Sequence, residues 1–384
     1  MDWITGKRDD SKKLVAQLSD PSKRAAAANE LIHQGSAAVD ALTDALASRD
    51  ASMRTLAAQI LVKMGTTAVP RLSQNLGTAH PATRQWIADI LGEIRHPSAL
   101  PALTEAARGE YFTVRARAAS ALARIGNASS VPTLNALLGD SEPAVRIAAA
   151  LAVGIFGDPS SIIPLSDLLL EDREIEVRQA AAQGLAATRL KEAVPYFIEA
   201  MADSFWWYER ENAAEPLLAS LTKFGADAVE PLIDALRHYE ATVRRSAAIV
   251  LGRIGDTRAV ETLGMALYDL HDEVGRAAAD SLAGFGAPAL GVLSEALQHP
   301  EAGIRLRAVS ALTKIRDPRV LPLLAEMLHD HDRLVLKQVI QSLGELRDPR
   351  SGAALTPIAE DRSDRELSML AREALKKIVI TQTP

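Results

Sequence analysis

The residue types that bind metals stand side by side in the run 329–332, which reads His-Asp-His-Asp. A metal site needs several such ligands to converge on one ion at about 2 Å. The other histidines of this half of the chain, His238, His271 and His299, lie in separate segments. We expect them to be capping and solvated turn residues. The sequence predicts no metal site, no cofactor and no catalytic residues.

Arginine recurs after an aliphatic residue, as in Val114-Arg115 and Val243-Arg244. A guanidinium can bind phosphate or pair with a carboxylate. The net charge of −6 argues against a groove that grips nucleic acid through bulk positive charge. We therefore expect a ladder, in which each guanidinium pairs with a carboxylate or with helix carbonyls of its neighbour. The arginines that could instead read phosphate are Arg115, Arg117, Arg124, Arg245, Arg253 and Arg276.

Aromatic residues gather in the segment 204–211, which contains two of the four tryptophans. Tryptophan, tyrosine and arginine are enriched at the hot spots of protein interfaces. We hypothesise a partner-binding site that combines this cluster with apolar residues of the fifth copy of the repeat described below. The alternative is that the aromatics fill a gap made by a longer turn. The proposed site residues are Ile147, Leu151, Ile155, Trp206, Trp207, Tyr208 and Arg210.

These residues lie on an internal repeat. The segment RRSAAIVLGRIGDTRAVETLGMAL from Arg244 recurs as RARAASALARIGNASSVPTLNALL from Arg115 and as RLRAVSALTKIRDPRVLPLLAEML from Arg305. Successive copies are 30–32 residues apart, apart from one step of 36. The twelve anchors are Arg24, Arg54, Arg84, Arg115, Arg146, Arg178, Ala214, Arg244, Gly275, Arg305, Leu336 and Ser368.

Each copy predicts two helices. In the copy anchored at Arg115, Val114, Ala118 and Leu122 form the apolar stripe of an amphipathic helix, and Gly126 is a stop signal. Asp-Pro dipeptides then predict an N-cap with proline at the start of the second helix. Because one such pair cannot bury its apolar face alone, the copies must stack.

We therefore expect an all-α solenoid of about twelve helix pairs and no sheet. It forms a single domain over residues 1–384, with repeats over about 9–380 and an irregular longer step near 204–211. The helices near 10–19 and 364–380 are expected to cap the stack. No segment has the apolar length of a membrane span or a leader, so we expect a cytoplasmic protein with no membrane partner.

The helix that carries the anchor is expected to line the concave side. Its stripe opposite the core lies at offsets 1, 5 and 9 from the anchor. This stripe is apolar in the fifth copy, at Ile147, Leu151 and Ile155, and the eighth copy adds Ile249. In the second and third copies it is polar: Thr55, Gln59, Lys63, Gln85, Asp89 and Glu93.

The pattern resembles the HEAT-repeat family, in the short form first noted in phycobilisome lyases. The signature V-R-x-x-A-A-x-A-L-G-x-I-G-D-P-x-A-V-P-x-L is nearly whole at Val243–Leu263. The resemblance covers almost the entire chain and implies the solenoid fold more strongly than any function, because this family includes scaffolds, lyases, hydroxylases and glycosylases.

The function that we favour is a non-catalytic scaffold that binds a protein through its concave surface. The resemblance also implies an alternative, a phycobilin-lyase-like protein that handles a tetrapyrrole; without cysteine, however, the chain cannot hold it through a thioether. A DNA-binding glycosylase-like role fits less well, since only Trp86 and Asp89 echo that pattern in an acidic chain. The family's di-iron hydroxylase uses His-Glu pairs, and this sequence has none.

Overall fold

The computed structural model describes residues 2–207 and 213–380. Across those two ranges the regular elements are α-helices and short 3₁₀-helices, and no strand is present. The all-α prediction is confirmed. The chain divides into two compact units, which we call unit 1 (residues 1–193) and unit 2 (residues 194–384).

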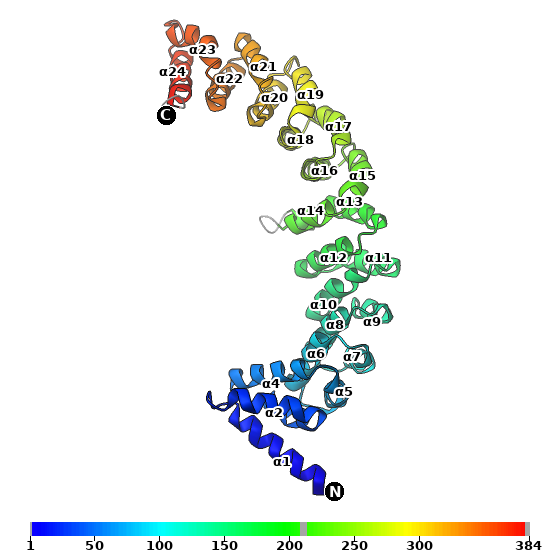
Figure 1. The fold of residues 1–384 in the computed structure, drawn as a ribbon. Coiled ribbons are helices and arrows are strands. Elements are labelled where there is room, and N and C mark those ends of the chain that lie inside the picture. The colour runs from blue at the N-terminus through cyan, green and yellow to red at the C-terminus, as the bar shows by residue number, and fades with distance from the viewer. Residues whose placement is uncertain (1, 208–212, 381–384) are drawn as a thin grey trace. The chain divides into compact units, whose positions relative to one another are not determined.

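The helices of unit 1 form two layers (Figure 1). Successive even-numbered helices contact one another, and each odd-numbered helix packs on the even-numbered helix that follows it. The even layer of unit 1 consists of α2 (Arg24–Gln34), α4 (Ala51–Met64), α6 (Pro81–Ile94), α8 (Phe112–Ile125), α10 (Pro143–Val153) and α12 (Ile175–Thr188). The odd layer consists of α1 (Asp2–Gln17), α3 (Val39–Ala45), α5 (Val69–Thr78), α7 (Leu100–Ala106), α9 (Val131–Leu137) and α11 (Ile162–Glu171).

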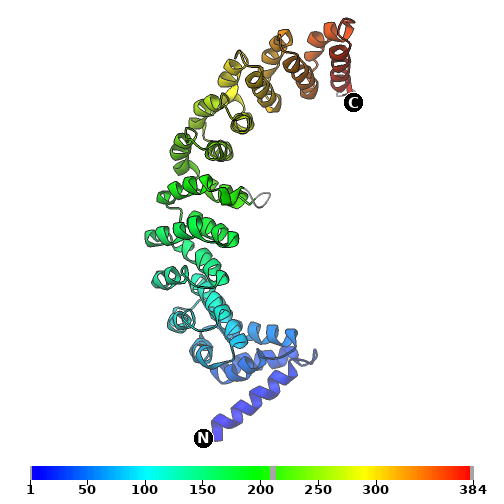
Figure 2. The ribbon, with the colours of Figure 1, turned by 180° about the vertical axis from the view of Figure 1, so that it is seen from behind.

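Unit 2 is built in the same way, as Figure 2 shows from behind. Its even layer consists of α14 (Glu215–Thr222), α16 (Ala241–Ile254), α18 (Asp272–Phe285), α20 (Ala302–Lys314), α22 (Arg333–Leu346) and α24 (Arg365–Ile380). Its odd layer consists of α13 (Val194–Ala202), α15 (Val229–Ala235), α17 (Val260–Ala266), α19 (Leu290–Ala296), α21 (Val320–Glu326) and α23 (Ser351–Glu360). Each even helix carries one predicted anchor, except that Ala214 directly precedes α14.

The apolar stripe faces the space between the layers, as predicted. Val114, Ala118 and Leu122 of α8 are buried, and Gly126 ends the helix with a positive φ of 72° that glycine adopts without strain. The Asp-Pro dipeptides differ from the prediction in one respect. The proline of each lies ahead of the second α-helix. In the fifth copy Asp158 caps the 3₁₀-helix η6 (Pro159–Ser161), and α11 begins only at Ile162.

Two glycines let α10 and α12 approach closely. An added Cβ on Gly154 would lie 2.2 Å from the carbonyl oxygen of Gly184, and one on Gly184 would lie 2.4 Å from that of Ala150. After Val153 the chain tightens into the 3₁₀-helix η5 (Gly154–Phe156). This contact fixes the end of α10, where Leu151 lies, and η5, which contains Ile155.

The longer step in the repeat coincides with the shortened helix α14. The other anchors of unit 2 lie inside their helices, but α14 begins at Glu215, after its anchor. Pro216 explains the late start, because proline lacks an N–H donor and fits only the first turn of a helix. The 3₁₀-helix η8 (Ser204–Trp206) precedes this point.

Candidate functional site

Four anchor arginines pair with aspartates in the turns that lead to the next even helix. In each pair the arginine Nε and Nη2 donate to the two carboxylate oxygens at 2.6–3.0 Å. Nη1 donates to backbone carbonyls of the turn before its own helix. The predicted ladder is thus present in both units. Its pairs are Arg115–Asp140, Arg146–Asp172, Arg244–Asp269 and Arg305–Asp330.

Three of the four ladder carboxylates, Asp140, Asp269 and Asp330, have a pKa below the usual value of an aspartate. Burial alone would raise the pKa of Asp330, but hydrogen bonds from Arg305 and from the backbone N–H of Asp332 outweigh it and lower the pKa below its usual value. The same balance, with their own partners, lowers the pKa of Asp140 and of Asp269. These carboxylates therefore stay ionised in the folded protein under mildly acidic conditions.

This predicts a specific acid sensitivity. A carboxylate with a lower pKa in the folded state stabilises that state above its unfolded pKa of about 4 and loses the effect as the pH falls through the folded value. We expect the free energy of unfolding to fall below about pH 4, and Asp269→Asn to reduce that dependence. Urea unfolding at several pH values measures it. An unchanged pH dependence in Asp269→Asn would contradict the prediction.

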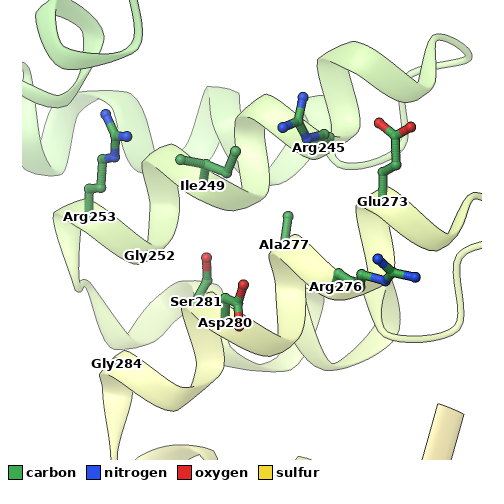
Figure 3. Close-up of a pocket in the computed structure, with 10 residues that line it drawn as sticks. All are labelled: Arg245, Ile249, Gly252, Arg253, Glu273, Arg276, Ala277, Asp280, Ser281 and Gly284. Carbon is green, nitrogen blue, oxygen red and sulfur yellow. The ribbon is translucent and has the colours of Figure 1, made fainter. Parts of the chain in front are cut away.

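Most of the remaining arginines that could read phosphate are already paired. Arg117 and Arg124 both contact Asp89, Arg253 contacts Glu215 and Arg276 contacts Asp272. Arg245 differs: among the described residues its side chain has no ion pair and no hydrogen bond. Figure 3 shows it at the edge of a hollow in unit 2.

This hollow, which we call the α16–α18 groove, lies on the even layer and has a volume of about 490 Å³. Its lining includes the offset 1, 5 and 9 positions of two successive copies, as the predicted stripe requires, together with Gly252, Glu273, Ala277 and Ser281. Figure 3 shows Ile249 and Ala277 in the middle, with Arg253 toward one end and Glu273 and Arg276 toward the other. The groove thus combines an apolar centre with charged ends, as protein interfaces do. The stripe residues are Arg245, Ile249, Arg253, Arg276, Asp280 and Gly284.

A close contact between the two helices forms part of the lining. Ser281 donates a hydrogen bond of 2.8 Å to the carbonyl oxygen of Ala248. An added Cβ on Gly252 would lie 2.4 Å from the Ser281 hydroxyl, so only glycine fits between the helices as they stand. Sequence reasoning missed Gly252 and Ser281 as site residues. The glycine belongs to the repeat signature, but its packing against the next copy could not be inferred from it.

The apolar patch predicted in the fifth copy lies on the even layer of unit 1. Leu151 and Ile155 have 43% and 56% of their surface exposed, and Ile147 is half-buried. An exposed pair of large aliphatic side chains one turn apart is available for contact with another molecule. The unit 1 residues of the predicted site therefore follow one another along α10 and the adjoining η5.

The aromatic residues of the predicted site belong to unit 2. Trp206 is only 1% exposed, while Trp207 is half-buried and donates a hydrogen bond of 2.9 Å from Nε1 to the carbonyl oxygen of Met201. Tyr208 and Arg210 lie outside the described residues. A joint site of these residues with Ile147, Leu151 and Ile155 stays a prediction. The indole of Trp206 is buried in the core of unit 2, so a partner cannot contact it in this structure.

Comparison with known families decides the class of the protein. The model of HEAT repeats matches residues 108–186, 194–283 and 290–376, which is more than half of the chain. The chain belongs to the HEAT-repeat family. A model described as the PBS lyase HEAT-like repeat also matches this HEAT protein, at residues 83–109.

A curated relative and two solved structures resemble this HEAT protein over different lengths. It is 39% identical over 103 residues to phycocyanobilin lyase subunit beta of Pseudanabaena tenuis, a match that covers 27% of this chain and 35% of the lyase. The structure of Kap121p bound to Nup53p matches with a TM-score of 0.59 at 13% identity, over 97% of this chain and 49% of Kap121p. The Kap95p structure with RanGDP gives a TM-score of 0.54 at 13% identity, over 99% of this chain and 61% of the matched chain. The chain thus spans about half the length of Kap121p, and these two matches show the fold alone.

Within residues 2–207 and 213–380, no group of three or more histidine, aspartate or glutamate side chains is arranged to hold a metal ion. None of the helices in the described part of the chain combines the length and the apolar character that crossing a bilayer requires.

Proposed function

We propose that this HEAT protein is a non-catalytic scaffold that binds a protein segment along its even layer, which we take to be the concave surface. The observation that carries the proposal is the α16–α18 groove, where offset positions of two successive repeats form a hollow with Ile249 at its centre. An apolar contact within a polar rim is the usual composition of a protein interface. Arg245, which has no partner among the described residues, adds a charge that a partner can engage.

The even layer of unit 1 carries an apolar contact of its own, the exposed pair Leu151 and Ile155. Because a long segment can contact several repeats in succession, separate apolar contacts add to its affinity. The fold comparison also supports binding of proteins, since the solved structures of Kap121p hold Nup53p or Pho4p. Catalysis is not part of this proposal. The single continuous domain and the cytoplasmic location stay predictions.

The test replaces Ile249 by aspartate, which places a charge at the apolar centre of the groove. A central contact of this kind contributes about 2 kcal/mol or more, so we expect the affinity for the partner to fall at least about tenfold. Proteins captured from a lysate by the wild-type protein are purified, and their affinity for both forms is measured. The matched control is Met265→Asp, which places the same charge on exposed α17 in the odd layer.

The two variants separate the outcomes. If Ile249→Asp binds the purified partner as tightly as the wild type, the groove is not the binding surface. If Met265→Asp causes the larger loss, the partner binds the odd layer and the proposal is wrong. Circular dichroism of both variants checks that each remains folded.

The lyase match favours a second candidate, a protein that handles a tetrapyrrole. Its support is the 39% identity over 103 residues, which is confined to about a third of the lyase. Co-expression with a bilin and a phycobiliprotein acceptor tests it. Faster or more selective bilin attachment to the acceptor supports the lyase-like role, whereas attachment at the uncatalysed rate removes that candidate.

A further inference from the structure

Three copies of unit 1 keep the anchor arginine but lack the aspartate of the complete rungs. In the four complete rungs, the aspartate stands three residues before an even helix and pairs with the anchor arginine of the preceding copy. Ser48, Thr78 and Gly109 occupy that position before α4, α6 and α8, and the corresponding anchors are Arg24, Arg54 and Arg84. Of the three, only the position that belongs to Arg84 is a glycine, which has no side chain. The chain therefore retains a guanidinium but supplies no carboxylate for it.

Two incomplete rungs of unit 2 lack the arginine as well as the aspartate. Where the anchor is Ala214 or Gly275, the residue three positions before the next even helix is His238 or His299, respectively. In both cases the histidine Nδ1 accepts a backbone N–H of the turn and so replaces the capping role of the aspartate. These copies lack both charges, whereas the rungs of Arg24, Arg54 and Arg84 lack only the acid.

Arg84 is left with unused donors. Its Nε donates to the carbonyl oxygen of Ala79 at 2.6 Å, whereas its Nη1 and Nη2 have no hydrogen-bond or ion-pair partner among the described residues. In the complete rungs, Nη2 of each arginine donates to an aspartate oxygen. A half-buried guanidinium with free donors is a site for a planar anion, because its fork matches the two oxygens of a carboxylate.

A pocket occupies the place of the missing carboxylate. It has a volume of about 240 Å³ and lies between α5 and α7 at the N-terminal ends of α6 and α8, where Arg84 and Gly109 both line it. Ser73 lines it too, and its buried hydroxyl has no hydrogen-bond partner in the described part of the chain. Tyr111, which is exposed, also lines the pocket and offers a surface for an extended chain.

We propose that this pocket binds an aspartate side chain of a protein partner, which completes the rung of Arg84 in trans. The guanidinium would donate to the carboxylate as it does within the complete rungs. That the carboxylate comes from a protein rests on the proposed function, whereas the carboxylate chemistry rests on the pocket alone. Glu105 and Glu110 also line the pocket, so the affinity of a single side chain is limited by their repulsion.

The probe is N-acetyl-aspartate N-methylamide, with the asparagine analogue and acetate as comparisons. Saturation-transfer NMR on the full chain detects weak binding of such small molecules. We expect a saturable signal for the aspartate probe, a signal at least about tenfold weaker for the asparagine analogue, and weaker binding of acetate, which lacks the peptide groups. Equal signals from the aspartate and asparagine probes would overturn the carboxylate site. Acetate binding as tight as that of the aspartate probe would overturn the protein source.

The variant Gly109→Asp supplies the missing acid from the chain itself. An added Cβ on Gly109 meets only the backbone carbonyl of Ala106, with its oxygen at 3.2 Å and its carbon at 4.0 Å, so a side chain can be accommodated with a small shift. We expect this variant to raise the urea midpoint and to abolish binding of the aspartate probe. The matched control Gly109→Ala adds the Cβ without the charge and should retain binding.

Arg84→Gln should abolish the signal of the aspartate probe and should not raise the urea midpoint. A Gly109→Asp protein that is folded and still binds the probe would overturn the proposal, as would a urea midpoint below that of Gly109→Ala. If the wild-type protein binds the aspartate probe but Ile249→Asp still binds the partner, the carboxylate site stands and the groove proposal is wrong. The two proposals therefore fail separately.

Discussion

Replacing Arg305 by alanine is expected to lower the free energy of unfolding by about 3–5 kcal/mol. The Arg305 and Asp330 side chains are only 4% and 3% exposed, which makes this the most buried rung of the ladder. Removing the guanidinium leaves the carboxylate of Asp330 ionised, buried and without its charged partner. It also removes the donors that satisfy the carbonyl oxygens of His299 and Pro300.

Urea unfolding followed by circular dichroism measures this loss. Two controls separate burial of a lone charge from the value of the ion pair itself. Arg305→Lys keeps the charge but not the forked geometry, and it should lose less. The double variant Arg305→Met/Asp330→Leu removes both charges and should recover much of the stability, because apolar packing can replace a buried ion pair. A loss below about 1 kcal/mol in Arg305→Ala would contradict a buried rung.

Replacing Trp206 by alanine is expected to cost about 3–5 kcal/mol, because the deleted side chain leaves a large cavity. Trp206 is 1% exposed and lies in η8, which packs beside α13. Its indole nitrogen has no hydrogen-bond partner among the described residues. Trp206→Phe should therefore cost much less than the alanine variant, since it keeps most of the apolar volume and removes an unsatisfied donor.

Thermal or urea unfolding of Trp206→Ala, Trp206→Phe and Trp207→Ala measures the difference. Trp207 is half-buried and makes one hydrogen bond to Met201, so its loss should be smaller. The alanine variant of Trp206 bears on the hypothesis of an aromatic binding site. Unchanged stability together with lost partner binding would mean that the indole reaches the partner after all, contrary to its burial here.

The repeat made the helix layers and the ladder predictable. Spacing between anchors determines which residues are equivalent, and the helical period then assigns Val114 to the core and Ile249 to the open stripe. Because the same offsets recur in each copy, a wrong assignment of a residue in one copy can be recognised by comparison with the other copies. The groove at Ile249 follows from this regularity, as does the pairing of Arg244 with an acid.

Contacts between non-equivalent positions were not predictable. Gly275 interrupts the ladder in the sequence, but Arg307 of α20 reaches into the place of the missing anchor and donates to the carbonyl oxygen of Leu267 at 2.6 Å. An added Cβ on Gly275 would lie 2.3 Å from Nη1 of Arg307. The arginine comes from a different offset in a different copy, so no repeat alignment pairs the two. The burial of Trp206 could not be predicted for a similar reason, because the segment around it departs from the repeat.

The most direct test of the proposed scaffold places a photo-activatable cross-linking residue at single positions of the two layers. Positions 151 and 249 report on the even layer, and the exposed apolar positions 163 and 265 report on the odd layer. The account predicts that the partner cross-links from positions 151 and 249 at levels well above those from 163 and 265. Cross-links confined to positions 163 and 265 would contradict binding along the even layer.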